Sequence, residues 1–293
     1  MARAAVAAHA GKTFGGGLLE LRRELERQGV ADPLWLEIPK SKYASKAVTS
    51  ALKQGANLIF VWGGDGTVQR CLDASVGTKT ELAIVPAGTA NLFARNLGIP
   101  QDIGKCVDIG LHGARRTLDV GCFNGERFGV MAGAGFDAAM IQQAGGGLKD
   151  HLGRVAYVWT GSQNLRAKPF RAKIAVDGTS WYDDKASCIL IGNLGSLFGG
   201  VEAFDDADPE DGRLEVGVVN ADGVMDWMRT LARTAVGHPD RSPFVRVTKA
   251  RKIKVKLNRK VLYEVDGGDR VKVRRFKVEV EPRAVTVCVA KAQ

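Results

Sequence analysis

Three glycines and one carboxylate follow a short apolar run, in the sequence Gly63-Gly64-Asp65-Gly66-Thr67. The apolar residues 58–62 predict a buried strand, and a helical pattern begins near Val68. Glycines at such a turn let the backbone approach a ligand closely, and free amides at a helix start attract phosphate. Asp65 would repel bare phosphate, but it can hold Mg²⁺ beside a nucleotide. The stretch therefore predicts a nucleotide site, with a tight turn capped by aspartate as the alternative.

A second glycine turn follows the next predicted strand, within residues 86–95. Gly88 opens this turn, and Thr89 is predicted to be the N-cap of the helix that follows. Asn91 and Arg95 are one helical turn apart, so we expect them on one face, with Arg95 as a phosphate clamp. A surface pair without a ligand is the alternative. If the two strands are neighbours, both turns lie at the carboxyl edge of the sheet, where open α/β folds bind ligands.

The elements that carry these turns alternate between strands and helices over residues 1–118. Four short apolar runs predict strands, at residues 4–9, 34–38, 58–62 and 82–86. This βαβ succession predicts an α/β, Rossmann-like domain with a mostly parallel sheet. Residues 119–293 are rich in short alternating runs instead, interrupted by helical stretches near 152–165 and 224–236. They predict a second, all-β, sandwich-like domain.

Composition and charge narrow the class of protein. The chain has 293 residues, of which 45% are hydrophobic and 25% charged, as in ordinary globular domains. Its apolar runs are too short to span a bilayer, and we expect no signal peptide. The five scattered cysteines form no C-x-x-C pair and are typical of reduced thiols in a cytosol.

The net charge of +10 is concentrated in residues 246–277, which hold 13 Lys or Arg and three acidic residues. Such a concentration favours an anionic partner, whether nucleic acid, acidic lipid or phosphate. The alternation of basic and apolar residues in 252–257 is equally typical of a solvated sheet face. Tyr263 and Phe276 are the only aromatic residues among these basic ones, so we expect no nucleic-acid partner.

Together these motifs resemble the diacylglycerol kinase catalytic family, specifically its soluble bacterial lipid kinases, which are related in fold to sphingosine and ceramide kinases. The likeness continues through residues 119–138, 192–216 and 265–269. It implies an α/β nucleotide domain of the NAD kinase/diacylglycerol kinase-like kind, followed by a β-sandwich, with the active site between them. The implied activity is transfer of the γ-phosphate of ATP to the hydroxyl of diacylglycerol or a related lipid. The implied enzyme is cytoplasmic and docks peripherally on an anionic membrane surface.

The resemblance also implies roles for individual residues. ATP contacts are implied at Gly63, Gly64, Asp65, Gly66, Thr67 and Thr89. A structural Mg²⁺ is implied at an acidic loop, bound by the side chain of Asp211 and the main-chain oxygens of Asp208 and Arg213. The loop itself, residues 202–212, carries six carboxylates, which suits a hard cation. A solvated acidic turn is the alternative.

Two departures from the family pattern affect the expected chemistry. The family's first loop reads Asn-Pro-x-x-Gly, whereas residues 7–11 keep only Gly11 of it. The family's catalytic strand end reads Asp-Gly-Glu, whereas here Gly268 replaces the Glu that usually accepts the proton. Asp266 is then the predicted proton acceptor, with Asp269 within reach, and Asp65 is the second predicted catalytic residue.

Other functions remain open at this level. An NAD kinase shares Gly-Gly-Asp-Gly-Thr but would carry an Asn-rich second motif. Gly-x-Gly-x-x-Ala at 133–138 could mark a dehydrogenase, yet it follows the βαβ region. A nucleotide-binding relic without the kinase step is compatible with Gly268, whereas a serine hydrolase lacks its Gly-x-Ser-x-Gly motif. The sequence does not identify the lipid, and it leaves a homodimer open.

Overall fold

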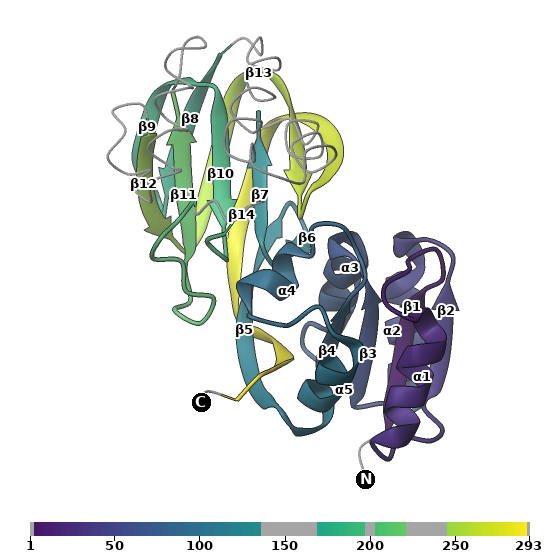
Figure 1. The fold of residues 1–293 in the computed structure, drawn as a ribbon. Coiled ribbons are helices and arrows are strands. Elements are labelled where there is room, and N and C mark those ends of the chain that lie inside the picture. Colours follow the sequence, from purple (N-terminus) through teal and green to yellow (C-terminus); the bar gives the residue numbers. More distant parts are fainter. Residues whose placement is uncertain (1–2, 136–168, 197–202, 221–244, 292–293) are drawn as a thin grey trace, which may run out of the picture. The chain divides into compact units, whose positions relative to one another are not determined.

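The computed structural model describes residues 3–135, 169–196, 203–220 and 245–291 (Figure 1). The chain forms two compact units, residues 1–120 with 282–293 and residues 121–281. The division expected from the sequence, at 118/119, assigned the whole C-terminal segment to the second domain. In the structure the last strand changes units after Glu281. The helical stretches expected near 152–165 and 224–236 lie outside the described residues.

The first unit is built on a parallel sheet whose strands are ordered β2–β1–β3–β4. Their bounds are β1 Ala4–His9, β2 Leu34–Ile38, β3 Leu58–Gly63 and β4 Glu81–Pro86. All but one residue of β1 and of β4, and every residue of β3, are buried. Such continuous burial is expected where helices cover both faces of a parallel sheet. The predicted α/β fold is therefore confirmed for this unit.

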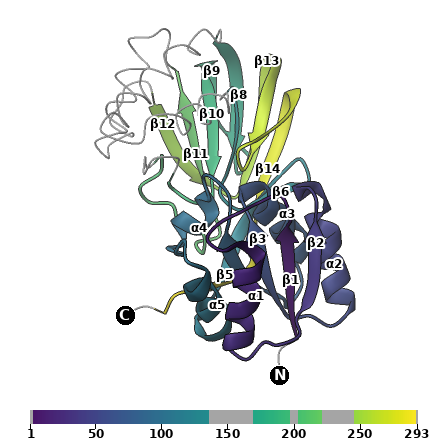
Figure 2. The same ribbon diagram turned by 45° about the vertical axis from the view of Figure 1, so that its right-hand side comes forward.

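Helices cover the two faces of this sheet (Figures 1 and 2). Their bounds are α1 Gly17–Arg27, η1 Ser41–Tyr43, α2 Ala44–Lys53, α3 Asp65–Ser75, α4 Leu92–Asn96 and α5 Ile103–His112. Helix α1 packs on α5, and α2 packs on α3. Helix α5 was not predicted, although Asp102 accepts the amide proton of Lys105 at 2.8 Å as an N-cap should.

The second unit consists of antiparallel strands, which confirms the predicted β-sandwich-like domain. Its strands are β6 Glu126–Phe128, β7 Met131–Ala134, β8 Phe170–Val176, β9 Thr179–Ala186, β10 Cys188–Gly192, β11 Leu214–Val219, β12 Val245–Ala250 and β13 Lys252–Val265. Strands β5 Ala114–Phe123 and β14 Gly268–Val289 contribute residues to both units. The strand order is β12–β11–β10–β7–β13–β14, and β8 also pairs with β13.

Strand β13 is long and contains residues 252–257, the alternating basic and apolar run, together with the apolar residues that follow. Its pairing with β14 is irregular between Lys256 and Val261. The residues before this break pair with β8, and those after it pair with β7. A strand can pass from one layer of a sandwich to the other at such an irregularity. Phe123 packs in the core beneath it, stacked on Tyr263 and Phe276 with ring centroids 4.4 and 4.6 Å away.

Three hairpins of the second unit turn on a two-residue sequence that ends in glycine. These sequences are Asn124-Gly125 between β5 and β6, Asp177-Gly178 between β8 and β9, and Asp266-Gly267 between β13 and β14. Every residue of the three pairs has a positive φ. Positive φ at both central residues defines a type I′ turn, whose twist matches that of the flanking strands. Asn-Gly and Asp-Gly dipeptides are a sequence signal for such turns, and these three hairpins were not predicted.

Candidate active site

The two predicted glycine turns lie side by side. Strands β3 and β4 are parallel neighbours, with Gly63 in register with Pro86. Gly64 is the N-cap of α3, and the amide of Ala87 donates to the carbonyl oxygen of Gly63 at 2.9 Å. Both turns therefore lie at the carboxyl edge of the sheet, as predicted.

Glycine is required because the two turns touch through their backbones. A Cβ atom added to Gly88 would lie 2.5 Å from the Cα of Gly64, and one added to Gly64 would lie 3.0 Å from the Cα of Gly88. A Cβ on Gly63 would lie 2.6 Å from the Cβ of Thr67. A larger residue at Gly64 or Gly88 would push the turns apart, and one at Gly63 would displace the side chain of Thr67.

Asp65 links the first turn to the helix that follows the second. Its Oδ1 accepts a hydrogen bond from the amide of Phe93, in the first turn of α4, at 3.2 Å. Burial raises the pKa of the Asp65 carboxyl, whereas main-chain amides of Phe93, Leu92 and Asn91 act to lower it. The carboxylate thus has amide partners of its own, and a metal beside it stays a prediction.

Asn91 shapes the second turn instead of sharing a helix face with Arg95. It adopts a left-handed conformation with φ 50° and is the N-cap of α4. Its Oδ1 accepts from the amide of Gly88 at 2.8 Å, and its Nδ2 donates to the carbonyl oxygen of Gly88 at 2.9 Å. The predictions of Thr89 as the N-cap and of a common face were therefore wrong. Thr89 and Arg95 are both exposed.

The buried side chain of Thr67 packs against the first turn. Its side chain is 1% exposed, and its Oγ1 lies 3.0 Å from the Oγ of Ser41. Its amide donates to the carbonyl oxygen of Gly64 at 2.8 Å, so this amide is hydrogen-bonded within the turn. Gly66, by contrast, is exposed at the start of α3.

A third loop reaches the same edge of the sheet. From β1 the chain continues to β2, on one side of β1 in the sheet, and then crosses to β3 on the other side of β1. The carboxyl ends of β1 and β3 therefore form a topological switch point, where ligands bind in such folds. The exposed Gly11 follows β1, and Trp62 Nε1 donates to the carbonyl oxygen of Lys12 at 3.1 Å. Lys12 and Thr13 were not predicted as site residues, although Gly-Lys-Thr precedes a glycine cluster between a predicted strand and helix.

Asp266, the predicted proton acceptor, is held by backbone amides of its own unit. Its Oδ1 accepts from Val130 and Met131 at 3.0 and 2.9 Å, and its Oδ2 accepts from Gly129 at 2.9 Å. The residue is 8% exposed. Taking a proton from a substrate would disrupt these hydrogen bonds. The geometry therefore favours an anchoring role, and proton transfer by Asp266 stays a prediction.

An arginine lies where a side chain at position 268 would begin. A Cβ added to Gly268 would lie 2.5 Å from Nη1 of Arg270. The guanidinium contacts both carboxylate oxygens of Glu126, with distances of 2.7 Å from Nη2 and 2.9 Å from Nε. The space beside Gly268 is thus occupied by an arginine that is already paired with Glu126.

The acidic loop precedes β11 in the second unit. Oδ1 of Asp208 accepts from the amide of Glu210 at 3.0 Å, and Oδ1 of Asp211 accepts from the amide of Arg213 at 2.8 Å. Among the residues described, no group of three or more His, Cys, Asp or Glu is placed to hold a metal ion.

The basic stretch forms a solvated face, as its alternation predicted. Ile253, Val255 and Leu257 are buried, whereas the lysines between them are exposed. In the register of β13 with β14, Lys254 lies opposite Lys277. Like charges directly opposite each other on a sheet are destabilising.

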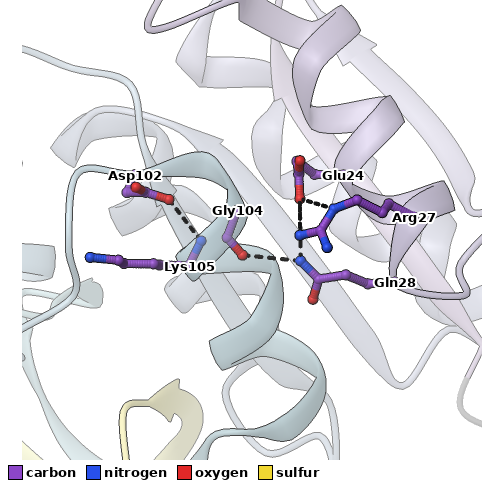
Figure 3. Close-up of polar contacts among 6 residues, drawn as sticks. All are labelled: Glu24, Arg27, Gln28, Asp102, Gly104 and Lys105. Carbon is purple, nitrogen blue, oxygen red and sulfur yellow. Dashed lines mark hydrogen bonds and ion pairs between the residues drawn. The ribbon is translucent and has the colours of Figure 1, made fainter.

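An open hollow of about 500 Å³ lies on the first unit between α1 and α5 (Figure 3). Nε2 of Gln28 donates to the carbonyl oxygen of Gly104 at 3.2 Å across it, and Arg27 is paired with Glu24 at 2.6 Å. None of the predicted site residues lines this hollow.

The comparisons with known proteins agree with this arrangement. Residues 6–123 match the family described as "Diacylglycerol kinase catalytic domain", and residues 130–289 match the "YegS C-terminal NAD kinase beta sandwich-like domain". The fold and the glycine turns thus define a two-domain class with an α/β unit and an NAD kinase-like sandwich. The chain belongs to the diacylglycerol kinase catalytic family of lipid kinases.

Relatives cover much of the chain. A "Probable lipid kinase YegS-like" of Pseudomonas syringae pv. tomato is 30% identical over 224 residues, 73% of each chain. A "Diacylglycerol kinase" of Bacillus subtilis is 28% identical over 228 residues, 76% of this chain and 75% of that protein.

Solved structures extend the likeness in fold. A diacylglycerol kinase from Bacillus anthracis has a TM-score of 0.76 at 21% identity and covers 98% of this chain and 96% of its own. An NAD kinase from Archaeoglobus fulgidus is more distant, with a TM-score of 0.52 at 12% identity over 98% and 93% of the two chains. No helix among the described residues is long and apolar enough to cross a membrane.

Proposed function

We propose that this chain transfers the γ-phosphoryl group of ATP to the hydroxyl of a lipid, diacylglycerol or a close relative. The observation that carries the proposal is the contact between the Gly64 and Gly88 turns at the ends of two parallel strands. Backbone turns at helix starts attract phosphate through N–H groups and the helix dipole. Membership of the lipid kinase family supports the choice of a lipid acceptor.

Within this proposal, exposed groups around the turns meet the nucleotide. Gly66 and Thr89 border the phosphates, and Arg95 clamps them from the end of α4. Mg²⁺ bound with a nucleotide needs only one or two protein carboxylates, so Asp65 fits as a nearby ligand, directly or through water. When bound, the ion would offset the negative charge of the phosphates.

The turnover expected of this chain is slow. Phosphoryl transfer depends mainly on positioning and on stabilising charge, because its transition state is loose in most analyses. A positioned base contributes about 10²–10⁴-fold, and Gly268 provides none. Asp266 is engaged with three amides, so proton acceptance by this residue would be inefficient.

We also propose that the protein docks peripherally on an anionic membrane. Exposed lysines and arginines from adjacent strands form a basic face with like charges opposite each other, at Lys254, Lys256, Arg275 and Lys277. An anionic bilayer would relieve that repulsion, and each such charge is worth about 1 kcal/mol near its surface.

The second candidate is a nucleotide-binding relic of the same fold, and Gly268 is the observation that favours it. One assay separates the two: transfer of label from [γ-³²P]ATP with Mg²⁺ to a lipid panel, with NAD as a further acceptor. We expect a labelled lipid. Label on NAD alone would indicate an NAD kinase, and ATP binding without transfer to any acceptor would indicate the relic.

Paired glycine variants test the site in the same assay. Gly88→Ala should abolish transfer and ATP binding, because its Cβ would collide with Gly64. Gly104→Ala is the matched control, since that glycine lies in α5 and the nearest atoms to its new Cβ would be side-chain atoms of Glu24 and Asp102, at 3.3–3.6 Å. Full activity of Gly88→Ala would show that the contact between the turns is not needed.

A further inference from the structure

The acidic loop already contains a cation supplied by the chain. Lys249 of β12 lies opposite Glu215 of β11 in the strand register. Its Nζ is 2.6 Å from the main-chain oxygen of Asp206, 3.0 Å from Oε1 of Glu215 and 3.2 Å from Oδ2 of Asp211. A lysine ammonium has three N–H donors, so each of them meets one oxygen.

These oxygens are of the kind that a hard divalent cation requires, namely carboxylates and a carbonyl. Asp211, the side chain expected to bind Mg²⁺, has both oxygens engaged, one by Lys249 and the other by the amide of Arg213. The main-chain oxygen of Asp208 faces the amide of Asp211 at 3.4 Å. The residues present therefore do not fit a metal ion while the ammonium stays in place.

Lys249 also serves a buried carboxylate. Glu215 is 6% exposed, so its carboxylate needs a nearby positive charge. Lys249 is the lysine that supplies it.

We propose that Lys249 is the built-in cation of the acidic loop, so that the loop holds its conformation without a bound divalent ion. This inference concerns the second unit alone and does not depend on the proposed phosphoryl transfer. It separates two uses of Mg²⁺: the nucleotide would bring its own ion, whereas the loop needs none.

Thermal unfolding of the full chain without nucleotide tests this. The midpoint of the parent should be the same in EDTA and in millimolar Mg²⁺ or Ca²⁺ at matched ionic strength. Lys249→Met should lower the midpoint in EDTA by several degrees, and divalent ions should restore part of that loss by occupying the vacated oxygens. Lys254→Met is the matched control, an exposed lysine on β13, and should show neither effect.

Two further variants keep the test decisive if Lys249→Met does not fold. Lys249→Arg retains the charge and should remain insensitive to divalent ions. Asp211→Asn should lower the midpoint equally in EDTA and in Mg²⁺. The proposal is overturned if Mg²⁺ raises the parent's midpoint in a saturable way that Asp211→Asn abolishes. Stoichiometric metal found by elemental analysis in the parent but not in Asp211→Asn would overturn it as well.

Discussion

Removing the carboxylate of Asp266 should destabilise the second unit severely. In Asp266→Ala, the buried amides of Gly129, Val130 and Met131 would all lose their acceptor. Each unsatisfied buried donor costs about 1–3 kcal/mol. Because the three bonds share one side chain and such losses are not additive, we expect a total of about 3–6 kcal/mol. At roughly 2–4 °C per kcal/mol for a domain of this size, the unfolding midpoint should fall by at least about 6 °C.

Asp177 offers a matched control for this experiment. It occupies the same position in another type I′ turn, and its Oδ1 accepts from the amides of Arg251 and Lys252 at 3.0 and 2.8 Å. It is exposed, so water can replace its carboxylate, and Asp177→Ala should cost far less stability. Urea and thermal denaturation of both variants give the comparison. Equal losses for the two alanine variants would refute the reasoning from buried amides.

Asp266→Asn separates anchoring from proton transfer. The amide group keeps one acceptor oxygen but points N–H groups toward at least one backbone amide, so its stability should fall between those of the parent and Asp266→Ala. Assayed well below its unfolding midpoint, the Asn variant should retain measurable activity if Asp266 is an anchor. Loss of transfer with unchanged stability would instead assign proton acceptance to this carboxylate.

Three further predictions follow from the same geometry. Burial raises the pKa of Asp65, so its contribution to stability is present at low pH and lost as pH rises through that raised pKa. Asp65→Asn should therefore unfold at a higher temperature than the parent at pH 7, unfold at a similar temperature near pH 4, and lose phosphoryl transfer. An equal difference in unfolding midpoint at both pH values would contradict this. Gly268→Glu should pair with Arg270 and speed transfer with ATP binding unchanged, measured as kcat, whereas an unaltered kcat would show that no base is missing. Charge reversal at Lys254 and Lys277 should reduce the amount of protein that sediments with anionic vesicles and should weaken the dependence of this binding on salt. Equal binding of the parent to neutral vesicles would contradict an electrostatic account.

Much of the first unit could be predicted because its signals are local. Residues 4–8 of β1, 58–62 of β3 and 82–86 of β4 form continuous apolar runs, as burial on both faces requires. Strand β9 was missed because it pairs only with β8 at the edge of its sheet and most of its residues are exposed. Its strand conformation comes from the neighbour, not from a pattern of its own.

The sequence by itself determined the glycine turns, the α/β and all-β halves and the basic alternation, because turn chemistry and side-chain periodicity act between near neighbours in the chain. The tertiary structure alone decided the partners of the charged groups. Asp65 bonds an amide 28 residues away, Asp266 bonds amides at least 135 residues away, and Lys249 meets Asp211 from 38 residues away. From the sequence alone, a carboxylate near glycines looks like a metal ligand whatever its partners are. Only the folded chain places an amide beside Asp65 and an ammonium beside Asp211, because such contacts depend on how distant strands and helices pack.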